Sequence, residues 1–172
     1  MQIHVIDFEG TRRHGISEFG VVTLGDDYQI QGTHFQAPSR PFDTYFDLFS
    51  DLRKTGIFSA HSAQTEDILL RHYWASPGYV PHFLSPQLIP TWGPWIDTKR
   101  LYQHYYQSPS FELRELIHAL NLQTTLDEYA KIYCDSEHRH YHHALYDALG
   151  AALLLQHYIR TASHHALEDL VL

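Results

Sequence analysis

The sequence predicts an α/β fold in which a central mixed sheet of five strands is flanked by helices. Short apolar runs separated by turn residues extend to about residue 36, which is typical of an antiparallel meander. Beyond them, apolar residues at helical spacing alternate with two further short apolar runs, which favours parallel strands joined through helices. The chain has 172 residues, of which 44% are hydrophobic, so we expect one domain over residues 1–172 with a substantial core.

The five strands follow one another along the chain. Three of them form the meander, and Gly25-Asp26-Asp27 is a turn signal between the second and the third. The last two are shorter and lie among the helices. The predicted strands are Ile3–Asp7, Glu18–Leu24, Gln29–Gln36, Ile57–His61 and Trp95–Asp97.

Helices are expected where apolar residues recur every three to four positions. The first such pattern runs through the aromatic residues at positions 42, 45, 46 and 49 to Leu52, and Gly56 is expected to end it. We interpret these aromatics as core residues and not as a platform for stacking bases. The remaining helices are predicted at Thr65–Trp74, Thr98–Tyr106, Glu112–Leu120, Leu126–Cys134 and Ala144–Arg160, with a helical tail at 163–172.

Two carboxylates stand at the end of the first predicted strand. Side chains two positions apart on a strand share a face and lie roughly 6.5–7 Å apart along it, so Asp7 and Glu9 would be neighbours if the strand reaches them. Such neighbours repel each other and lose solvation on burial. A hard divalent cation such as Mg²⁺ or Mn²⁺ relieves both effects, since it prefers oxygen ligands. A solvated strand end is the alternative interpretation.

A third acid, Asp147, lies in the first turns of the last predicted helix. His143 stands four positions before it and would share its face of a continuous helix, so spacing alone favours His143 as its partner. His142 is five positions before Asp147, about 140° around a helix, and could join it only from a preceding loop.

These motifs resemble those of the DEDDh 3′–5′ exonucleases in the DnaQ-like family, which has the RNase H-like fold. The resemblance spans about residues 1–160, and its pieces occur in the family's order. They are Asp7-Phe8-Glu9, Ala60-His61-Ser62-Ala63 with Asp67, Trp95-Ile96-Asp97-Thr98, and His142 with Asp147. Each piece alone is weakly specific, but four in order form a strong signal. In this family the histidine lies in a loop, five positions before the last aspartate, which selects His142.

The resemblance implies a catalytic site that takes two divalent metal ions, Mg²⁺ or Mn²⁺. Asp7 would bridge the two ions, and Glu9 and Asp147 would hold the first. Asp67 would help to hold the second. His142 would act as the general base toward the attacking water, since histidines titrate near neutral pH.

The second motif leaves its acid open, because both Glu66 and Asp67 follow His61 at spacings found among relatives. We predict Asp67, since aspartate is the usual residue there. Ser62 replaces an asparagine that is common in the family. Asp97 either supports the site or is a favourable acid at a helix N-terminus.

The implied activity is hydrolysis of phosphodiester bonds at single-stranded or frayed 3′ ends of DNA or RNA, with release of nucleoside 5′-monophosphates. The alternatives are a hydrolase of very short oligonucleotides or small phosphodiesters, and an inactive relative that only binds nucleic acid or a protein. Several relatives pair to complete the substrate groove, so a homodimer is left open. No motif separates DNA from RNA, because that choice depends on contacts to the 2′-hydroxyl.

The composition narrows the class of partner. A net charge of −8 argues against a general duplex-binding protein and suits a short grip on a strand end. Small basic groups occur at Arg12-Arg13-His14, Arg53-Lys54 and Lys99-Arg100, and a solvated surface is our interpretation of Arg53-Lys54. One cysteine, Cys134, precludes an internal disulfide, and we interpret it as a partly buried helix residue. With neither a membrane span nor a secretory leader in the pattern, we expect a cytoplasmic protein.

Two further segments stand out. Residues 75–94 are predicted to form a long loop, rich in proline and aromatic residues, that stacks on unpaired bases, folds over the core or contacts a second subunit. The tract from His138 to His143 is expected to place His142 and to offer a positive patch for phosphate. Binding of Zn²⁺ or Ni²⁺ there is the less favoured alternative, because alternating histidines in a loop lack defined ligand geometry.

Overall fold

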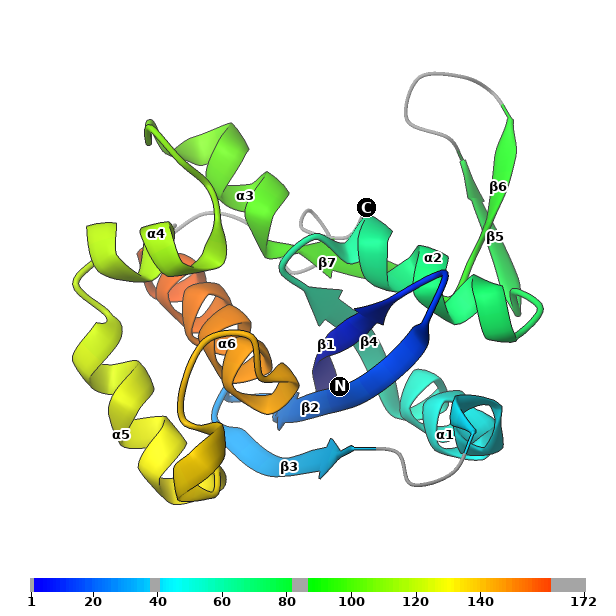
Figure 1. Cartoon of the computed structure of the whole chain (residues 1–172). Helices are drawn as coiled ribbons and strands as arrows, with labels where there is room; N and C mark the ends of the chain where they lie inside the picture. The colour runs from blue at the N-terminus through cyan, green and yellow to red at the C-terminus, as the bar shows by residue number, and fades with distance from the viewer. Residues whose placement is uncertain (1, 38–40, 82–86, 162–172) are drawn as a thin grey trace.

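The computed structural model describes residues 2–37, 41–81 and 87–161, apart from the side chains of residues 80 and 81. It contains a five-stranded sheet in the order β3-β2-β1-β4-β7 (Figure 1). The strands are β1 (Gln2–Thr11), β2 (Gly15–Leu24), β3 (Ile30–Gln36), β4 (Gly56–Ala60) and β7 (Trp95–Asp97). The first three form an antiparallel meander, and β4 and β7 add in parallel. The mixed sheet of the predicted RNase H-like fold is confirmed.

The helices also follow the predicted order. They are α1 (Phe46–Thr55), α2 (Ala63–Tyr73), α3 (Thr98–Tyr105), α4 (Leu113–Ala119), α5 (Gln123–Tyr133) and α6 (Ala144–Thr161), with short 3-10 turns at Phe42–Tyr45 and Ser136–His138. Cys134 is buried directly after the last residue of α5, one position beyond the helix in which we expected it. The predicted tail at 163–172 lies outside the described residues.

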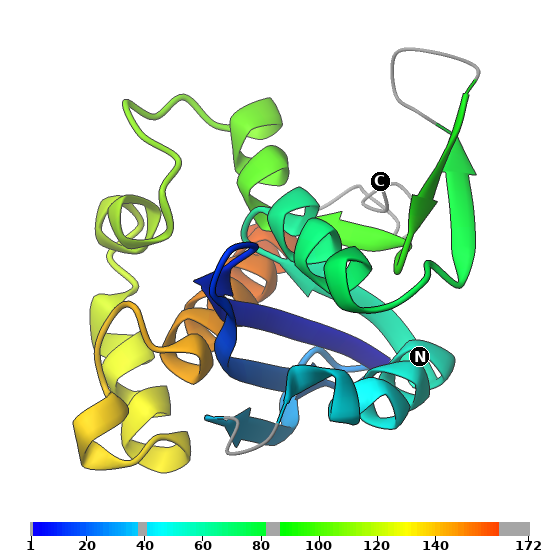
Figure 2. The same cartoon turned by 45° about the vertical axis from the view of Figure 1, so that its right-hand side comes forward.

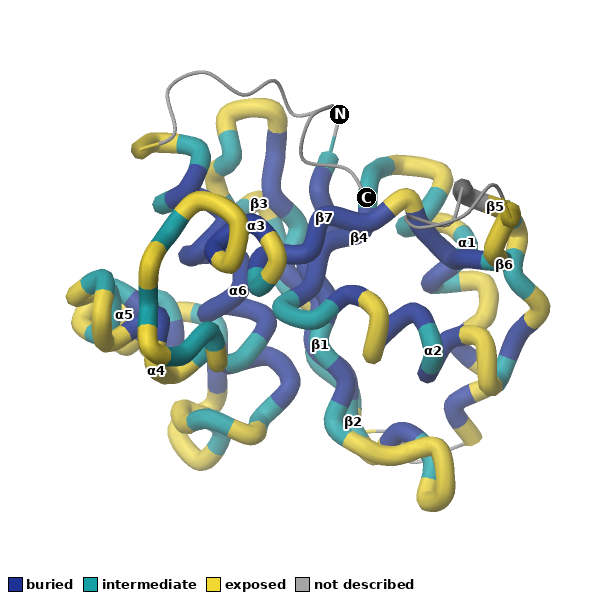
Figure 3. The backbone as a smooth tube through the Cα atoms, turned by 90° about the horizontal axis from the view of Figure 1, so that it is seen from above, coloured by how far each residue is buried: buried dark blue, intermediate teal, exposed yellow. Residues whose placement is uncertain are grey.

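Alternation along the strands sorts the core into two layers. Ile3 and Val5 of β1 pack with α6 on one face of the sheet, whereas Ile6 and Phe8 pack on the other face. On that second face, Phe8, Phe19, Phe42 and Phe49 form a cluster whose ring centroids are 5.3–6.5 Å apart. Phe42, Tyr45 and Phe49 of the first helical pattern are therefore core residues, as predicted, whereas Phe46 is 44% exposed and the prediction is wrong for it. Figure 3 shows how burial varies along the backbone, with buried strands at the centre and exposed turns of α4 and α5 outside.

Gly56 ends α1, as predicted, because it directly follows Thr55 and its N–H donates to the carbonyl of Leu52. Its φ of −164° is extended, and it is the first residue of β4. A Cβ at this position would lie 2.4 Å from the carbonyl oxygen of Gln2, so glycine is required by the close approach of β1 to β4. The helix ends there because the chain must enter the sheet.

The predicted loop at 75–94 is in part a β-hairpin. Strands β5 (Gly78–Pro81) and β6 (Leu88–Thr91) pair antiparallel and project from the body of the molecule (Figures 1 and 2). Arg53 fixes the base of the hairpin, because its Nε donates to the carbonyl of Trp92 at 3.0 Å and its Nη2 to that of Gly93 at 3.3 Å. The interpretation of Arg53 as a solvated surface charge is therefore wrong.

None of the described helices combines the length and the apolar character that a membrane span requires.

Candidate metal centre

Asp7 and Glu9 lie on the face of the sheet that carries α6. They continue the alternation of Ile3 and Val5 along β1, so they share a face, as predicted. In β2 the residue opposite Asp7 is Gly20. A Cβ at Gly20 would lie 2.5 Å from backbone atoms of Ala144 and Leu145, so the first turn of α6 touches the sheet here. This contact brings the acids of β1 to the start of α6.

His142 and Asp147 join the acids of β1 from the start of α6. His142 lies in the loop before the helix, and its N–H donates to Asp147 Oδ2 at 3.1 Å. One ligand atom each from Glu9, His142 and Asp147 lie within 4.8 Å of one another. In the part of the chain that the structure describes, this is the one group of three histidine, cysteine or carboxylate side chains that meets this limit.

The carboxylates of this region are short of positive charge. Loss of solvation raises the pKa of Asp7 well above its usual value, and the charges of Glu66, Asp147, Glu9 and Glu18 raise it further. Burial likewise raises the pKa of Asp147 to about 6, against the hydrogen bond from His142. The pKa of Glu9 is raised by burial, while His142 opposes the shift. A bound cation would stabilise the ionised form of all of them.

Glu66, the alternative acid of the second motif, lies beside Asp7. Strand β1 runs past β4, whose last pairing is Val5 with Ser59, and the N–H of Phe8 beyond that point donates to the Glu66 carboxylate. Burial raises the pKa of Glu66 to about 8. Its Oε2 is buried without a hydrogen-bond partner among the described residues, as is Oδ1 of Asp147. Two orphaned acceptor atoms in one acidic region are the features that a metal ion would satisfy.

Asp67, the predicted acid, is turned away from this region, and we correct that prediction. Its Oδ1 accepts hydrogen bonds from the Thr91 hydroxyl at 2.8 Å, the Trp92 N–H at 2.7 Å and the Trp95 indole at 3.0 Å. Its Oδ2 accepts from Arg71 Nε at 2.8 Å. Through these four hydrogen bonds Asp67 joins α2 to the end of β6 and the start of β7.

His61 and Asp97 organise the elements around the site. The Nε2–H of His61 donates to the carbonyl of Phe111 at 2.8 Å, and its Nδ1 is 2.9 Å from the Thr98 hydroxyl. Asp97 accepts from the N–H of Ala63, at the start of α2, and from the N–H of Arg100, in the first turn of α3. Asp97 is thus an acid at a helix N-terminus, the second of the two readings left open for it.

Glu18 lies beside the site but belongs to none of the motifs found in the sequence. This residue of β2 lies opposite Glu9 in the β1–β2 register. Its Oε1 accepts a hydrogen bond from the N–H of Ala144 and lies 3.3 Å from Nδ1 of His143. The register across a hairpin would have revealed the pairing, but the sequence alone does not fix the register.

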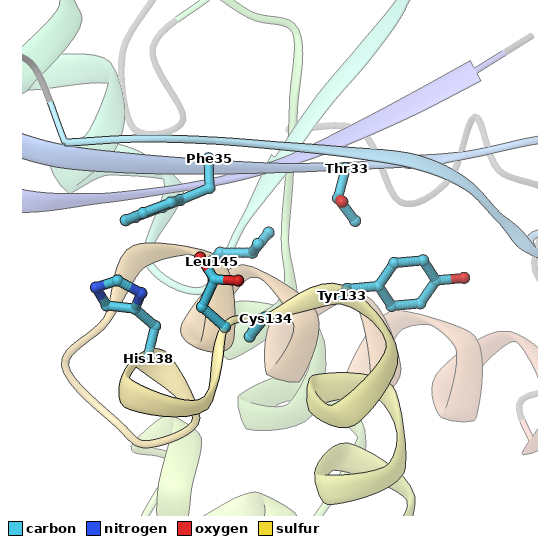
Figure 4. Close-up of a pocket in the computed structure, with 7 residues that line it drawn as sticks. Thr33, Phe35, Tyr133, Cys134, His138 and Leu145 are labelled. Carbon is cyan, nitrogen blue, oxygen red and sulfur yellow. The ribbon is translucent and has the colours of Figure 1, made fainter.

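The histidine tract forms ring contacts beside the site. His143 packs against His138 and His140, with ring centroids 4.7 and 4.2 Å away. A cavity of about 160 Å³ lies between β3 and the segment after α5, and His138 of the tract is part of its lining (Figure 4). Its lining includes Phe35, Cys134 and His138 but none of the predicted site residues. The cavity is therefore separate from the acidic centre.

Comparisons with known proteins support the fold. No family model matches the chain, and no curated protein matches it. Among solved structures, the chain is similar to one described as exonuclease X in complex with 5′ overhanging duplex DNA. The identity is 19% and the TM-score 0.61, over 98% of this chain and 97% of that one. At this identity the likeness is evidence for a shared fold.

We predict that Asp67→Ala destabilises the protein, whereas Glu66→Gln does not. Removing Asp67 leaves the buried donors of Thr91, Trp92 and Trp95 without an acceptor, and each unsatisfied buried donor costs about 1–3 kcal/mol. Urea unfolding measures both variants. Asp51→Ala is the matched control, because its pair with Lys54 is exposed and contributes little. Equal stabilities of Asp67→Ala and Asp51→Ala would contradict the structural role of Asp67.

We also predict that the metal-free protein loses stability as the pH rises from about 5 to about 8. The raised pKa of Glu66, about 8, means that the folded state keeps a proton that the unfolded chain releases near its ordinary pKa of 4.5. The folded state binds more protons throughout that window, so unfolding becomes easier with rising pH. Thermal melting in EDTA measures this, and Glu66→Gln should flatten the dependence. Glu112→Gln, at an exposed position, should leave it unchanged; the same slope in Glu66→Gln as in wild type would refute the explanation.

Proposed function

We propose that the protein is a metal-dependent 3′–5′ exonuclease that acts on single-stranded or frayed 3′ ends of DNA or RNA and releases nucleoside 5′-monophosphates. The observation that carries the proposal is the convergence of Glu9, His142 and Asp147 within 4.8 Å, beside Asp7. The resemblance of the motifs to the DEDDh exonucleases supports it. So does the shared fold with a solved exonuclease that was captured with 5′ overhanging duplex DNA.

The donor set fits divalent ions such as Mg²⁺ or Mn²⁺. Asp7, Glu9 and Asp147 offer carboxylate oxygens, and we assign Glu66 the role that the motif analysis gave to Asp67. The unpartnered oxygens of Glu66 and Asp147 are the structural basis of that fit. When bound, two such ions stabilise the charge that develops on the attacking and leaving oxygens of an in-line displacement.

The residues of the chain then have separate tasks. The four carboxylates, Asp7, Glu9, Glu66 and Asp147, would hold the ions and would themselves be stabilised as anions by them. His142 is exposed at the rim of the group and accepts the proton of the attacking water at a ring nitrogen. Arg12 and Arg13 are exposed at the tip of the β1–β2 hairpin, a few residues beyond Glu9, where they would contact backbone phosphates.

The β5–β6 hairpin does not favour the small-substrate alternative. Hydrolysis of small phosphodiesters would be favoured if residues 75–94 formed a lid over the site. The hairpin instead projects from the β7 side of the molecule, away from the first turn of α6 (Figures 1 and 2).

The test is a time course on 5′-labelled single-stranded DNA and RNA oligonucleotides with Mg²⁺, Mn²⁺ or EDTA. We expect a ladder that shortens from the 3′ end, absent in EDTA and absent in Asp7→Asn, because Asp7 is the acid shared by the ions. The faster substrate gives the sugar preference. No cleavage by folded, metal-loaded wild type would reject the proposal and favour a small phosphodiester substrate or a binding module. Near-normal activity of Asp7→Asn would reject the two-ion assignment.

We predict that His142→Ala loses far more rate than His143→Ala. General-base catalysis typically contributes about 10²- to 10⁴-fold, and His142 is the histidine whose ring nitrogen reaches Glu9 and Asp147. His143 is outside that group, with its Nδ1 3.3 Å from Glu18 Oε1, so its replacement should reduce the rate only several-fold. Steady-state kinetics on the preferred oligonucleotide measures both variants, and the reverse ranking would show that His143 is the base.

A further inference from the structure

We propose that Glu18 is a positioning residue that holds His142 in its active conformation. This inference rests on the proposed function for its kinetic part but not for its structural part. Glu18 lies opposite Glu9 and next but one to Gly20, the residue on which the first turn of α6 rests. It therefore stands where the sheet meets the loop that carries His142.

The contacts of Glu18 clamp the end of that loop. Its Oε1 accepts the N–H of Ala144, the first residue of α6, and lies 3.3 Å from Nδ1 of His143. The first N–H groups of a helix have no partner within it, and the helix dipole favours a negative charge at this end. The Glu18 side chain is 14% exposed, so water competes little for the interaction.

His142 needs such a clamp because its backbone is strained. Its φ of +68° lies in the left-handed region, which costs a non-glycine residue on the order of 1–3 kcal/mol. Two hydrogen bonds oppose relaxation of that conformation. One runs from the His142 N–H to Asp147, and the other, two residues on, from the Ala144 N–H to Glu18. If the second bond is lost, the loop can relax and the His142 ring leaves its place.

Glu18 does not act as one more ligand of the acidic centre. Unlike Glu66 and Asp147, it has no carboxylate oxygen among the buried atoms that lack a hydrogen-bond partner in the described residues. Its charge instead adds to the repulsion there, since it raises the pKa of Asp7, Glu9 and Asp147. What Glu18 contributes is an acceptor at a defined distance from β2, and a glutamine can supply the same acceptor.

The kinetic test compares Glu18→Ala, Glu18→Gln and Glu18→Asp with wild type on the preferred oligonucleotide. Displacement of a catalytic group by about 1 Å can lower the rate about 10²-fold, so we expect Glu18→Ala to lose roughly 10- to 100-fold in kcat with little change in KM. Glu18→Gln should retain activity to within a few-fold. Glu18→Asp keeps the charge but is one methylene shorter, and it should be slower than Glu18→Gln. The opposite order would show that the charge matters and would overturn the proposal.

A double-mutant cycle separates positioning of His142 from general support of the fold. In a His142→Ala background, Glu18→Ala should lower kcat little further, because the group that it positions is gone. An equal loss in both backgrounds would overturn the proposal. Thermal melting of every variant checks folding, and Glu18→Gln and Glu18→Asp carry the test if Glu18→Ala does not fold.

Amide hydrogen exchange gives a readout that needs no activity. Glu18→Ala should accelerate exchange at the N–H groups of Ala144 and His142, whereas Glu18→Gln should leave them protected. Unchanged protection in Glu18→Ala would overturn the inference even if the protein is an exonuclease. Lost protection in a wild-type-like fold that hydrolyses no phosphodiester would instead reject the proposed function and keep the structural role of Glu18.

Discussion

Repulsion among carboxylates at the end of β1 is the constraint on which the rest of the structure depends. Asp7, Glu9, Glu66 and Asp147 come from three elements, and burial raises the pKa of each. No described arginine or lysine is among the groups that act on these four pKa values. An arrangement of this kind destabilises an empty site, so it has to be held by the core around it. The two packed layers, one on each face of the sheet, provide that support, because they hold β1, α2 and α6 in place around the acids.

The same elements divide neighbouring residues between the site and its frame. Successive residues on a helix point about 100° apart, so Glu66 and Asp67 cannot face the same partner. Glu66 accepts a hydrogen bond from β1 and keeps a free oxygen, whereas Asp67 points in another direction and gathers four donors from α2, β6, β7 and the connection between these strands. The frame and the site are thus built from adjacent side chains of one helix turn, which couples the position of the hairpin base to that of the acidic centre.

Much of this could be predicted from the sequence. The order of strands and helices follows from local periodicity, and Asp7, Glu9, His142 and Asp147 occupy one region as the motifs implied. The errors lie where long-range geometry decides. Our proposal of Glu66 in place of Asp67 depends on the extension of β1 beyond the last residue that pairs with β4. The base of the hairpin at 78–91 is held by hydrogen bonds from Arg53, which is remote in sequence. Glu18 went unrecognised because its partner Ala144 is reached only once the β1–β2 register and the packing of α6 are known.

The pair His142 and His143 shows how backbone conformation can override spacing. On a continuous helix His143 would face Asp147, and indeed its carbonyl accepts the first helical hydrogen bond, from the N–H of Asp147. Its ring, however, packs edge-on against His138 and His140, and its Nδ1 lies 3.3 Å from Glu18 Oε1. His142 itself has the left-handed backbone, and its own side chain joins Glu9 and Asp147. A residue just outside the helix therefore reaches the site because the helix start is fixed on β2, and the strain at one residue is sustained by contacts made at its neighbours.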